Sequence, residues 1–170
     1  MPHSALSAPW RIDYIKSLSK PAPDGCFLCD AAKAATDAER RERLVLWSDE
    51  HVVVLMNRYP YSNGHLLVAP KAHKAEPEEL TDAEHLAVGK ATTDAVALLR
   101  RAVSAQGFNV GMNLGRVAGA GVPGHLHQHV VPRWGGDTNF MHVVGEVPVI
   151  PEATGRLYDE LLRMVTNMPR

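Results

Sequence analysis

Cysteine and aromatic residues are scarce in this chain: of its 170 residues, two are cysteines and 6% are aromatic. Cys26 and Cys29 lie too close together in sequence to close a long disulfide loop. A chain of this length can bury a sizeable core without such cross-links. We therefore expect a single domain without disulfides in a reducing compartment, where both cysteines are available as metal ligands.

Long hydrophobic runs and an excess of charge of one sign are also missing. No apolar stretch approaches the roughly 20 residues that cross a bilayer, and the first ten residues contain no apolar signal core. The formal net charge of -1 gives no general affinity for a polyanion or an anionic surface. The sequence thus predicts a cytoplasmic protein that binds neither nucleic acid nor membrane.

Apolar runs bounded by turn residues predict about five strands. They cover residues 44–47, 52–56, 65–69, 108–114 and 125–131. The clearest helix begins with a capping box at Thr81 and Glu84 and is expected to stop at Gly107. Its apolar positions at helical spacing are Leu86, Val88, Ala91, Ala95, Leu98, Leu99 and Ala102.

Two further segments complete the expected fold. Residues 31–43 look helical or loosely ordered, and a shorter amphipathic helix is expected around residues 156–165. The whole pattern predicts an α+β fold, an antiparallel sheet of about five strands with helices packed on one side. We expect residues 1–25 to form an arm, residues 26–141 the main domain, and residues 142–170 a tail with its helix packed on that domain.

Three histidines occupy alternate positions, His125, His127 and His129. On an extended strand their rings would share one face, roughly 7 Å apart. If the histidines were purely structural, three titratable rings would occupy positions where apolar side chains could be buried. Imidazole can instead act as nucleophile, proton carrier or metal ligand. The cluster therefore predicts catalysis or a metal site. A catalytic zinc held by all three is the rival interpretation, although one strand supplies two such ligands comfortably.

Two neighbouring motifs carry further chemistry. The glycine-rich loop of residues 115–124 can turn its N–H groups inward to bind an anion, or it is a long flexible turn, since no lysine follows as in a P-loop. Cys26 and Cys29 form a C-x-x-C pair that can give two thiolates to zinc. Thioredoxin-like redox chemistry is the alternative, but this pair follows a proline-rich arm instead of a strand.

Together these motifs resemble the histidine triad (HIT) superfamily of nucleotide hydrolases and transferases. The resemblance is carried by Asn57 to His73, by Asn113-x-Gly115 and by His125 to Arg133, and it extends from about residue 26 to 140. Residues 129–141 look most like the bacterial diadenosine tetraphosphate phosphorylase branch.

The resemblance implies catalytic roles for four histidines. His127 would attack the α-phosphorus of a nucleotide and form a covalent nucleotidyl-imidazole, which water or phosphate then resolves. His129 would contact the phosphate and leaving group, and His65 would complete the cluster. A backbone carbonyl such as that of His125 is well placed to hold the other ring nitrogen of His127, leaving one basic nitrogen free.

Binding residues follow from the same resemblance. Asn57 would bind the ribose, although Asn is also an ordinary turn residue. Leu55 would lie beneath the base, and Asn113 would open a phosphate loop whose amides include those of Gly119 and Gly121. A structural zinc ion would be held by Cys26, Cys29, His73 and His125.

The expected function is phosphorolysis of diadenosine tetraphosphate to ADP and ATP in a homodimer or higher homo-oligomer. Hydrolysis of an adenosine phosphoramidate or another small nucleotide is the nearest alternative, and a nucleotide sensor without turnover is an alternative of another class. Val122 stands where many relatives have Ser or Thr that touches the leaving group. The resemblance therefore leaves the preferred leaving group and acceptor open.

Overall fold

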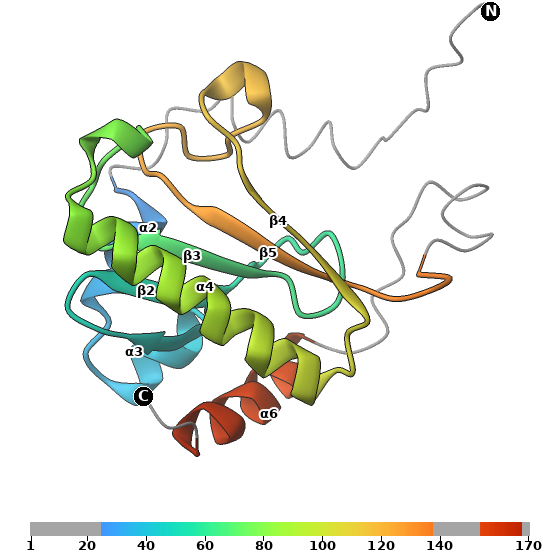
Figure 1. Ribbon diagram of the computed structural model, residues 1–170. Coiled ribbons are helices and arrows are strands. Elements are labelled where there is room, and N and C mark those ends of the chain that lie inside the picture. Colours follow the sequence, from blue (N-terminus) through green and yellow to red (C-terminus); the bar gives the residue numbers. More distant parts are fainter. Residues whose placement is uncertain (1–24, 138–153, 168–170) are drawn as a thin grey trace, which may run out of the picture.

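The computed structural model describes residues 25–137 and 154–167. Its five strands form one antiparallel sheet of order β1-β2-β3-β5-β4 (Figure 1). The strands are β1 (Val45–Ser48), β2 (Val52–Met56), β3 (Leu66–Pro70), β4 (Gly107–Met112) and β5 (Gln128–Arg133). The predicted α+β class and five-stranded antiparallel sheet are confirmed.

Helices cover both faces of this sheet. Helices α4 (Asp82–Ala102) and α6 (Thr154–Thr166) pack against one face, where alternate residues of β2 and β3 form the larger core. On the opposite face, α2 (Phe27–Lys33) packs against β2. The short helix α3 (Asp37–Glu42) contacts the edge strand β1, and its Arg41 bonds to Asp159 of α6. The prediction of helices on one side only is therefore wrong, because residues 31–43 gave too weak a pattern to reveal a helix that starts at Phe27.

The long helix begins as predicted and ends earlier. The Thr81 N–H donates to Glu84 Oε2 at 2.7 Å and the Glu84 N–H donates to Thr81 Oγ1 at 3.3 Å, which completes the capping box. The helix stops at Ala102 because Ser104 adopts a left-handed φ of 51°, and Gly107 opens β4 instead.

Leu86 does not belong to the buried side of α4, since it is 74% exposed. It lies two residues, or about 200° of helix rotation, from Val88. The side chains that α4 buries are Glu84, Val88, Ala91, Ala95, Leu98 and Leu99.

The last strand also differs from its prediction. β5 begins at Gln128, so only His129 of the three alternating histidines lies within a strand. Residues before it are held by other bonds: the Leu126 N–H donates to the Lys74 carbonyl at 2.7 Å. The three rings therefore do not share one strand face.

The predicted C-terminal helix is confirmed as α6, which buries Leu157, Tyr158, Leu161 and Val165. The Tyr158 hydroxyl donates to the Val45 carbonyl at 2.9 Å, tying α6 to the edge strand β1. Most of the predicted arm, residues 1–24, and residues 138–153 of the predicted domain and tail lie outside the described residues.

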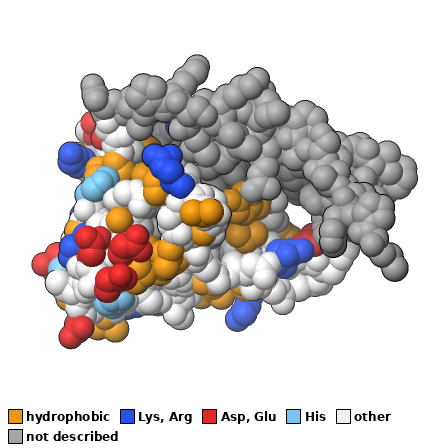
Figure 2. All heavy atoms as spheres, turned by 90° about the horizontal axis from the view of Figure 1, so that it is seen from above, with side chains coloured by type: hydrophobic (Ala, Val, Ile, Leu, Met, Phe, Trp, Pro, Cys, Tyr) orange, Lys and Arg blue, Asp and Glu red, His pale blue; other side chains and the backbone are white. Residues whose placement is uncertain are grey.

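No helix in the described part of the chain is long and apolar enough to cross a membrane. On the face seen in Figure 2, exposed hydrophobic side chains lie between separate groups of acidic and basic side chains.

The backbone conformation of Gly64 positions the next residue, His65. Its φ is +78°, and an added Cβ would approach Leu99 Cδ2 to 3.0 Å. We expect Gly64→Ala to lower the free energy of unfolding by about 1–3 kcal/mol. In the control Gly89→Ala, within α4, the new Cβ meets open space, and a gain of about 0.5–1 kcal/mol is expected. Urea denaturation measures both, and equal effects would contradict the argument.

Candidate functional site

The histidine cluster lies where β3 and β5 run side by side. Leu67 pairs with His129, so His65, two residues earlier and just before β3, lies diagonal to His129 on the same face of the sheet. The His65 and His129 ring centroids are 5.1 Å apart, and those of His127 and His129 are 5.0 Å apart. Three of the four predicted catalytic histidines thus form one group.

Hydrogen bonds fix which nitrogens of His65 and His129 carry protons. His65 Nδ1 accepts from the Tyr61 N–H at 3.1 Å, and a backbone N–H can only donate. The neutral His65 ring therefore carries its proton on Nε2, which lies 2.9 Å from His129 Nδ1. His129 Nδ1 accepts that proton's hydrogen bond, so the proton of His129 itself is on Nε2.

The Nε2–H group of His129 is buried and has no hydrogen-bond partner among the described residues. A buried donor without an acceptor is rare in folded proteins and often marks a position that a ligand oxygen fills. This group is therefore suited to an anionic substrate.

His127 presents the complementary chemistry. Its Nδ1 lies 2.8 Å from the His125 carbonyl oxygen, which can only accept, so Nδ1 carries the proton. The lone pair on Nε2 is then available for attack or for proton transfer, as predicted for the nucleophile. A nucleophilic nitrogen and an N–H donor on adjacent rings fit displacement at a centre that bears anionic oxygens.

Burial keeps these rings neutral at pH 7. It lowers the pKa of His65 to about 3, and positive charge on His129 or His127 would lower it further. Burial likewise lowers the pKa of His129 to about 4, with a smaller contribution from His127. The pKa of His127 is also lowered by burial, against the opposing effect of its bond to the His125 carbonyl. Neutral rings are what a nucleophile and its neighbouring donor require.

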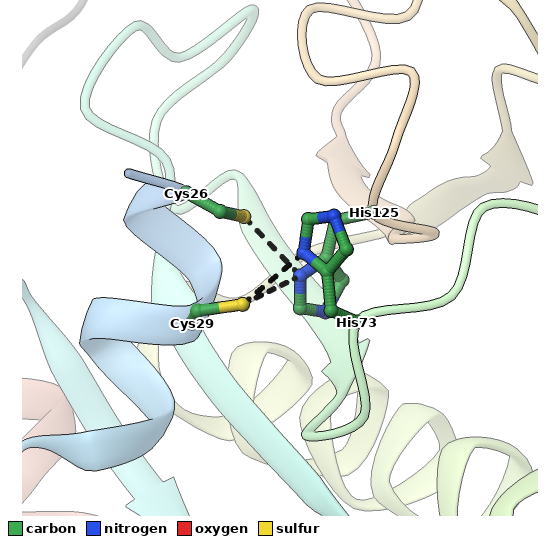
Figure 3. A group of neighbouring side chains, drawn as sticks. All are labelled: Cys26, Cys29, His73 and His125. Carbon is green, nitrogen blue, oxygen red and sulfur yellow. Dashed lines mark hydrogen bonds between the residues drawn. The ribbon is translucent and has the colours of Figure 1, made fainter. Parts of the chain in front are cut away.

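A second group lies beside the histidine cluster: Cys26, Cys29, His73 and His125 converge from α2 and from the residues after β3 and before β5 (Figure 3). Cys26 Sγ is 3.2 Å from His125 Nδ1, and Cys29 Sγ is 3.2 Å from His73 Nδ1. All four ligand atoms lie within 4.8 Å of one another. A tetrahedral zinc site needs sulfur–nitrogen separations of about 3.6 Å, so the group fits and could hold a metal ion.

His125 belongs to this second group and not to the reacting one. Its Nδ1 faces the thiols and its Nε2 lies 2.8 Å from the Pro70 carbonyl oxygen. Both ring nitrogens are therefore engaged, and its contribution to the histidine cluster is the carbonyl that holds His127.

Asn57 and Leu55 are more enclosed than their predicted binding roles suggest. Asn57 Nδ2 is 3.2 Å from His65 Nδ1, and its Oδ1 accepts from the Tyr59 N–H at 3.0 Å. Leu55 is 3% exposed and packs with Leu67 beneath α2. Asn57 thus contacts the histidine cluster directly, while contact of either residue with a nucleoside stays a prediction.

The loop before β5 is present, and at least two of its amides are already bonded, one of them the Ala120 N–H, which donates to the Gly115 carbonyl at 3.2 Å. The Gly119 N–H donates to the Arg116 carbonyl at 3.0 Å, and Gly119 has a φ of +89°. Asn113 lies beside this loop, with its Nδ2 4.0 Å from the Cβ position of Gly119. Gly121 lies in the same loop, so phosphate binding by Asn113, Gly119 and Gly121 stays a prediction.

Two residues of the site were missed in the sequence. Tyr61 gives its N–H to His65, and its ring lies 4.8 Å from that of His65 and 5.8 Å from that of His129, centroid to centroid. The Lys74 backbone carbonyl accepts from the Leu126 N–H, and Lys74 Nζ donates to Glu84 Oε2 at 2.7 Å. Tyr61 lies four residues before His65, and this spacing is only a weak sign of a contact between them. Nothing in the sequence indicates that Lys74 contacts Leu126.

The lowered pKa values predict a pH dependence of stability. A histidine in the unfolded chain has a pKa near 6.5, against about 3 for His65 and about 4 for His129 in the fold. Unfolding therefore takes up protons below pH 6.5, and stability present above that pH is lost as the pH falls. The slope is up to about 1.4 kcal/mol per pH unit for each buried histidine.

We expect urea denaturation to show this loss between pH 6.5 and pH 4, and His65→Asn to reduce its slope. His85→Asn, at an exposed position of α4, is the control and should retain the wild-type slope. A slope that His65→Asn leaves unchanged would contradict the assignment.

Comparison with known proteins agrees with this geometry. A family model described as the HIT domain matches residues 39–136. A protein of Mycobacterium tuberculosis named AP-4-A phosphorylase is 44% identical over 111 residues, which are 65% of this chain and 57% of that protein. An uncharacterised HIT-like protein of Methanocaldococcus jannaschii is 32% identical over 140 residues, which are 82% of this chain and 98% of that protein.

Among solved structures, a hypothetical histidine triad nucleotide-binding protein of Sulfolobus tokodaii has a TM-score of 0.64 and 27% identity, covering 84% of this chain and 93% of that one. The chain spans only 57% of the length of the Mycobacterium tuberculosis relative. The predicted resemblance to the superfamily and to its diadenosine tetraphosphate phosphorylase branch is confirmed. Since the HIT domain model covers more than half of its length, the chain belongs to the HIT family.

Proposed function

We propose that this protein cleaves dinucleoside polyphosphates by nucleotidyl transfer through His127. The observation that carries the proposal is the pairing of an available Nε2 on His127 with the buried Nε2–H of His129, which has no partner in the described part of the chain. The coarser conclusion, an enzyme of the HIT family that acts on nucleotides, rests on the family match and the similarity to AP-4-A phosphorylase.

The first step forms a bond between His127 Nε2 and the α-phosphorus, and the bond from phosphorus to the polyphosphate oxygen breaks. His129 Nε2–H donates a hydrogen bond to the oxygen that gains negative charge. In the second step phosphate attacks the same phosphorus, the phosphorus–nitrogen bond breaks, and its electrons return to His127. With diadenosine tetraphosphate, the products are ATP from the first step and ADP from the second.

The nucleoside of the transferred group would lie on the β2 side of the cluster. Asn57, which directly follows β2, contacts His65 there, and Leu55 lies within β2. The residues around 113–121 would surround the phosphates. The chain offers Val122 instead of a hydroxyl in this loop, so His129 and backbone amides carry the contacts to the phosphates.

Zinc is the metal that we propose for Cys26, Cys29, His73 and His125, because two thiolates and two imidazoles are donors that it prefers. A bound zinc ion would neutralise the thiolates and fix the ring of His125. His125 in turn holds His127 through its carbonyl, so the site supports the nucleophile without touching substrate. A cytoplasmic location and a homodimer or higher homo-oligomer stay predictions from the sequence.

Product analysis tests the proposed reaction. Purified protein with diadenosine tetraphosphate should release ADP and ATP only when phosphate is added, as separated by ion-exchange chromatography. Rapid quenching and mass spectrometry should find an adenylyl group on His127. Replacing His127 by Ala should reduce turnover by at least about a thousandfold, because the attacking nitrogen is lost.

The control is His51→Ala, at a surface position on the loop before β2. It removes a histidine outside the site and should keep the turnover of wild type. AMP and ATP as products would assign hydrolysis instead of phosphorolysis. An adduct on another residue would overturn the role of His127, and a wild-type protein that turns over no adenylylated substrate would exclude the enzyme.

Metal analysis tests the zinc site independently of activity. We expect about one zinc ion per chain after gentle purification, and none in the double variant Cys26→Ser, Cys29→Ser. Because metal affinity adds to the free energy of folding, a strong chelator should lower the melting temperature of the wild type but not of the double variant. Less than half a zinc ion per chain, or equal chelator effects on both proteins, would contradict the site.

A further inference from the structure

Two hydrogen-bond donors converge on the Nδ1 atom of His65. One is the Tyr61 N–H at 3.1 Å, and the other is the side-chain amide of Asn57, whose Nδ2 lies 3.2 Å away. The orientation of this amide is fixed, because Asn57 Oδ1 accepts from the Tyr59 N–H at 3.0 Å and an amide nitrogen could not do so. His65 Nδ1 therefore faces two groups that can only donate, and it carries no proton.

This arrangement extends through His65 to His129. His65 Nε2 holds the one proton of its neutral ring and donates a hydrogen bond to His129 Nδ1 across 2.9 Å. His129 could take up a second proton at Nδ1 only if His65 moved its own proton to the opposite nitrogen, which the two donors prevent. Burial favours the same neutral state, since it lowers the pKa of His65 to about 3 and that of His129 to about 4.

A neutral His129 can stabilise a leaving group but cannot protonate it. Its buried Nε2–H has no partner among the described residues and can donate a hydrogen bond to a departing oxygen. The usual general acid is the imidazolium form, because a neutral imidazole gives up its last proton only to a very strong base. The imidazolium form of His129 is the one that the donors on His65 exclude, so the site offers charge stabilisation without proton transfer.

The outcome of the first step then depends on the leaving atom. His127 Nε2 forms a bond to the α-phosphorus, the bond from phosphorus to the leaving atom breaks, and its electron pair stays on that atom. A polyphosphate keeps this pair as a stable anion, since phosphate groups lose their second proton near a pH of about 6, and no proton has to move. An amine or an alcohol leaves only with a proton, which His129 does not supply.

We propose that Asn57 is a positioning residue that selects the leaving group, because its amide helps to hold His65 and His129 in tautomers that exclude proton transfer. The enzyme then cleaves adenylyl groups from polyphosphates and other acidic leaving groups, and it discriminates against phosphoramidates and alkyl esters. This selection deepens the proposed function and rests on it. It also separates that function from its nearest alternative, the hydrolysis of an adenosine phosphoramidate.

Leaving groups of different acidity test this selection. The 4-nitrophenyl and phenyl esters of adenosine 5′-monophosphate share the transferred half, but 4-nitrophenol is a much stronger acid than phenol. With phosphate as acceptor and chromatography of the products, we expect wild type to cleave the nitrophenyl ester with a kcat/KM at least about a hundredfold higher, a difference that a general acid would reduce. Adenosine 5′-phosphoramidate should likewise react far more slowly than adenosine 5′-tetraphosphate.

Asn57→Asp replaces the donor on His65 by an acceptor. With a carboxylate at Nδ1, His65 can carry a proton on each nitrogen. It can then pass its Nε2 proton to His129 Nδ1 while the His129 Nε2 proton moves to the leaving atom. We expect this variant to reduce the kcat/KM ratio of the two esters by about tenfold or more. Any contact of Asn57 with the ribose affects both esters equally and cancels in the ratio.

Matched variants separate the hydrogen bond from general damage. Asn57→Ala removes the amide without adding an acceptor, and the Tyr61 N–H still points at His65, so the ratio should stay high even where turnover of both esters falls. Tyr61→Phe keeps the N–H and removes the hydroxyl, and the ratio should again be that of wild type. A larger ratio in Tyr61→Phe would assign proton delivery to the hydroxyl and overturn the proposal. Thermal unfolding confirms that each variant is folded.

Nitrogen-15 NMR of the histidine rings tests the tautomers without turnover. At neutral pH we expect the wild-type rings of His65 and His129 to carry a proton on Nε2 alone, and Asn57→Asp to place protons on both nitrogens of His65. A proton on His65 Nδ1 in wild type, or a charged His129 ring at neutral pH, would overturn the proposal.

Turnover of wild type distinguishes failure of the selection from failure of the proposed function. Cleavage of the two esters at rates within about tenfold of each other would refute the selection and leave nucleotidyl transfer standing. A ratio that Asn57→Asp leaves unchanged would do the same. No cleavage of any of these adenylyl compounds would refute the proposed function and the selection together.

Discussion

His125 is the residue on which the rest of the site depends. One ring nitrogen faces the two thiols, the other lies 2.8 Å from the Pro70 carbonyl oxygen, and its own carbonyl holds His127. A single residue therefore joins α2, the end of β3 and the nucleophile.

The opposite anchor of the same segment comes from the start of α4. Glu84 Oε2 accepts from the Thr81 N–H and from Lys74 Nζ, and Lys74 first, then Thr81, lowers the Glu84 pKa to about 2. The Lys74 carbonyl accepts the Leu126 N–H. The cap of the long helix and the position of the nucleophile are thus mechanically coupled, and the residue between His125 and His127 cannot move without breaking this bond.

Local rules were enough for most of the fold, and long-range contacts decided the rest. The capping box at Thr81 and the apolar runs of β2 and β3 depend on neighbours in sequence, so their prediction succeeded. The start of β5 depends on Lys74 and Pro70, more than 50 residues away, and no periodicity contains them. The metal group was found through a resemblance, because spacing identifies Cys26 and Cys29 but not which histidines join them. Tyr61 was missed since it acts through its backbone and through a ring contact that only folding creates.

The direction of the hydrogen bonds gives the site its asymmetry. The Tyr61 N–H forces the proton of His65 onto Nε2, and this bond forces the proton of His129 onto its own Nε2. The His125 carbonyl imposes the opposite arrangement on His127, whose proton is on Nδ1. Two chemically identical side chains therefore face the substrate as a donor and as a lone pair, and both assignments originate in backbone groups that cannot change role. Because burial also disfavours protonation of either ring, the site keeps one nucleophile and one donor at neutral pH.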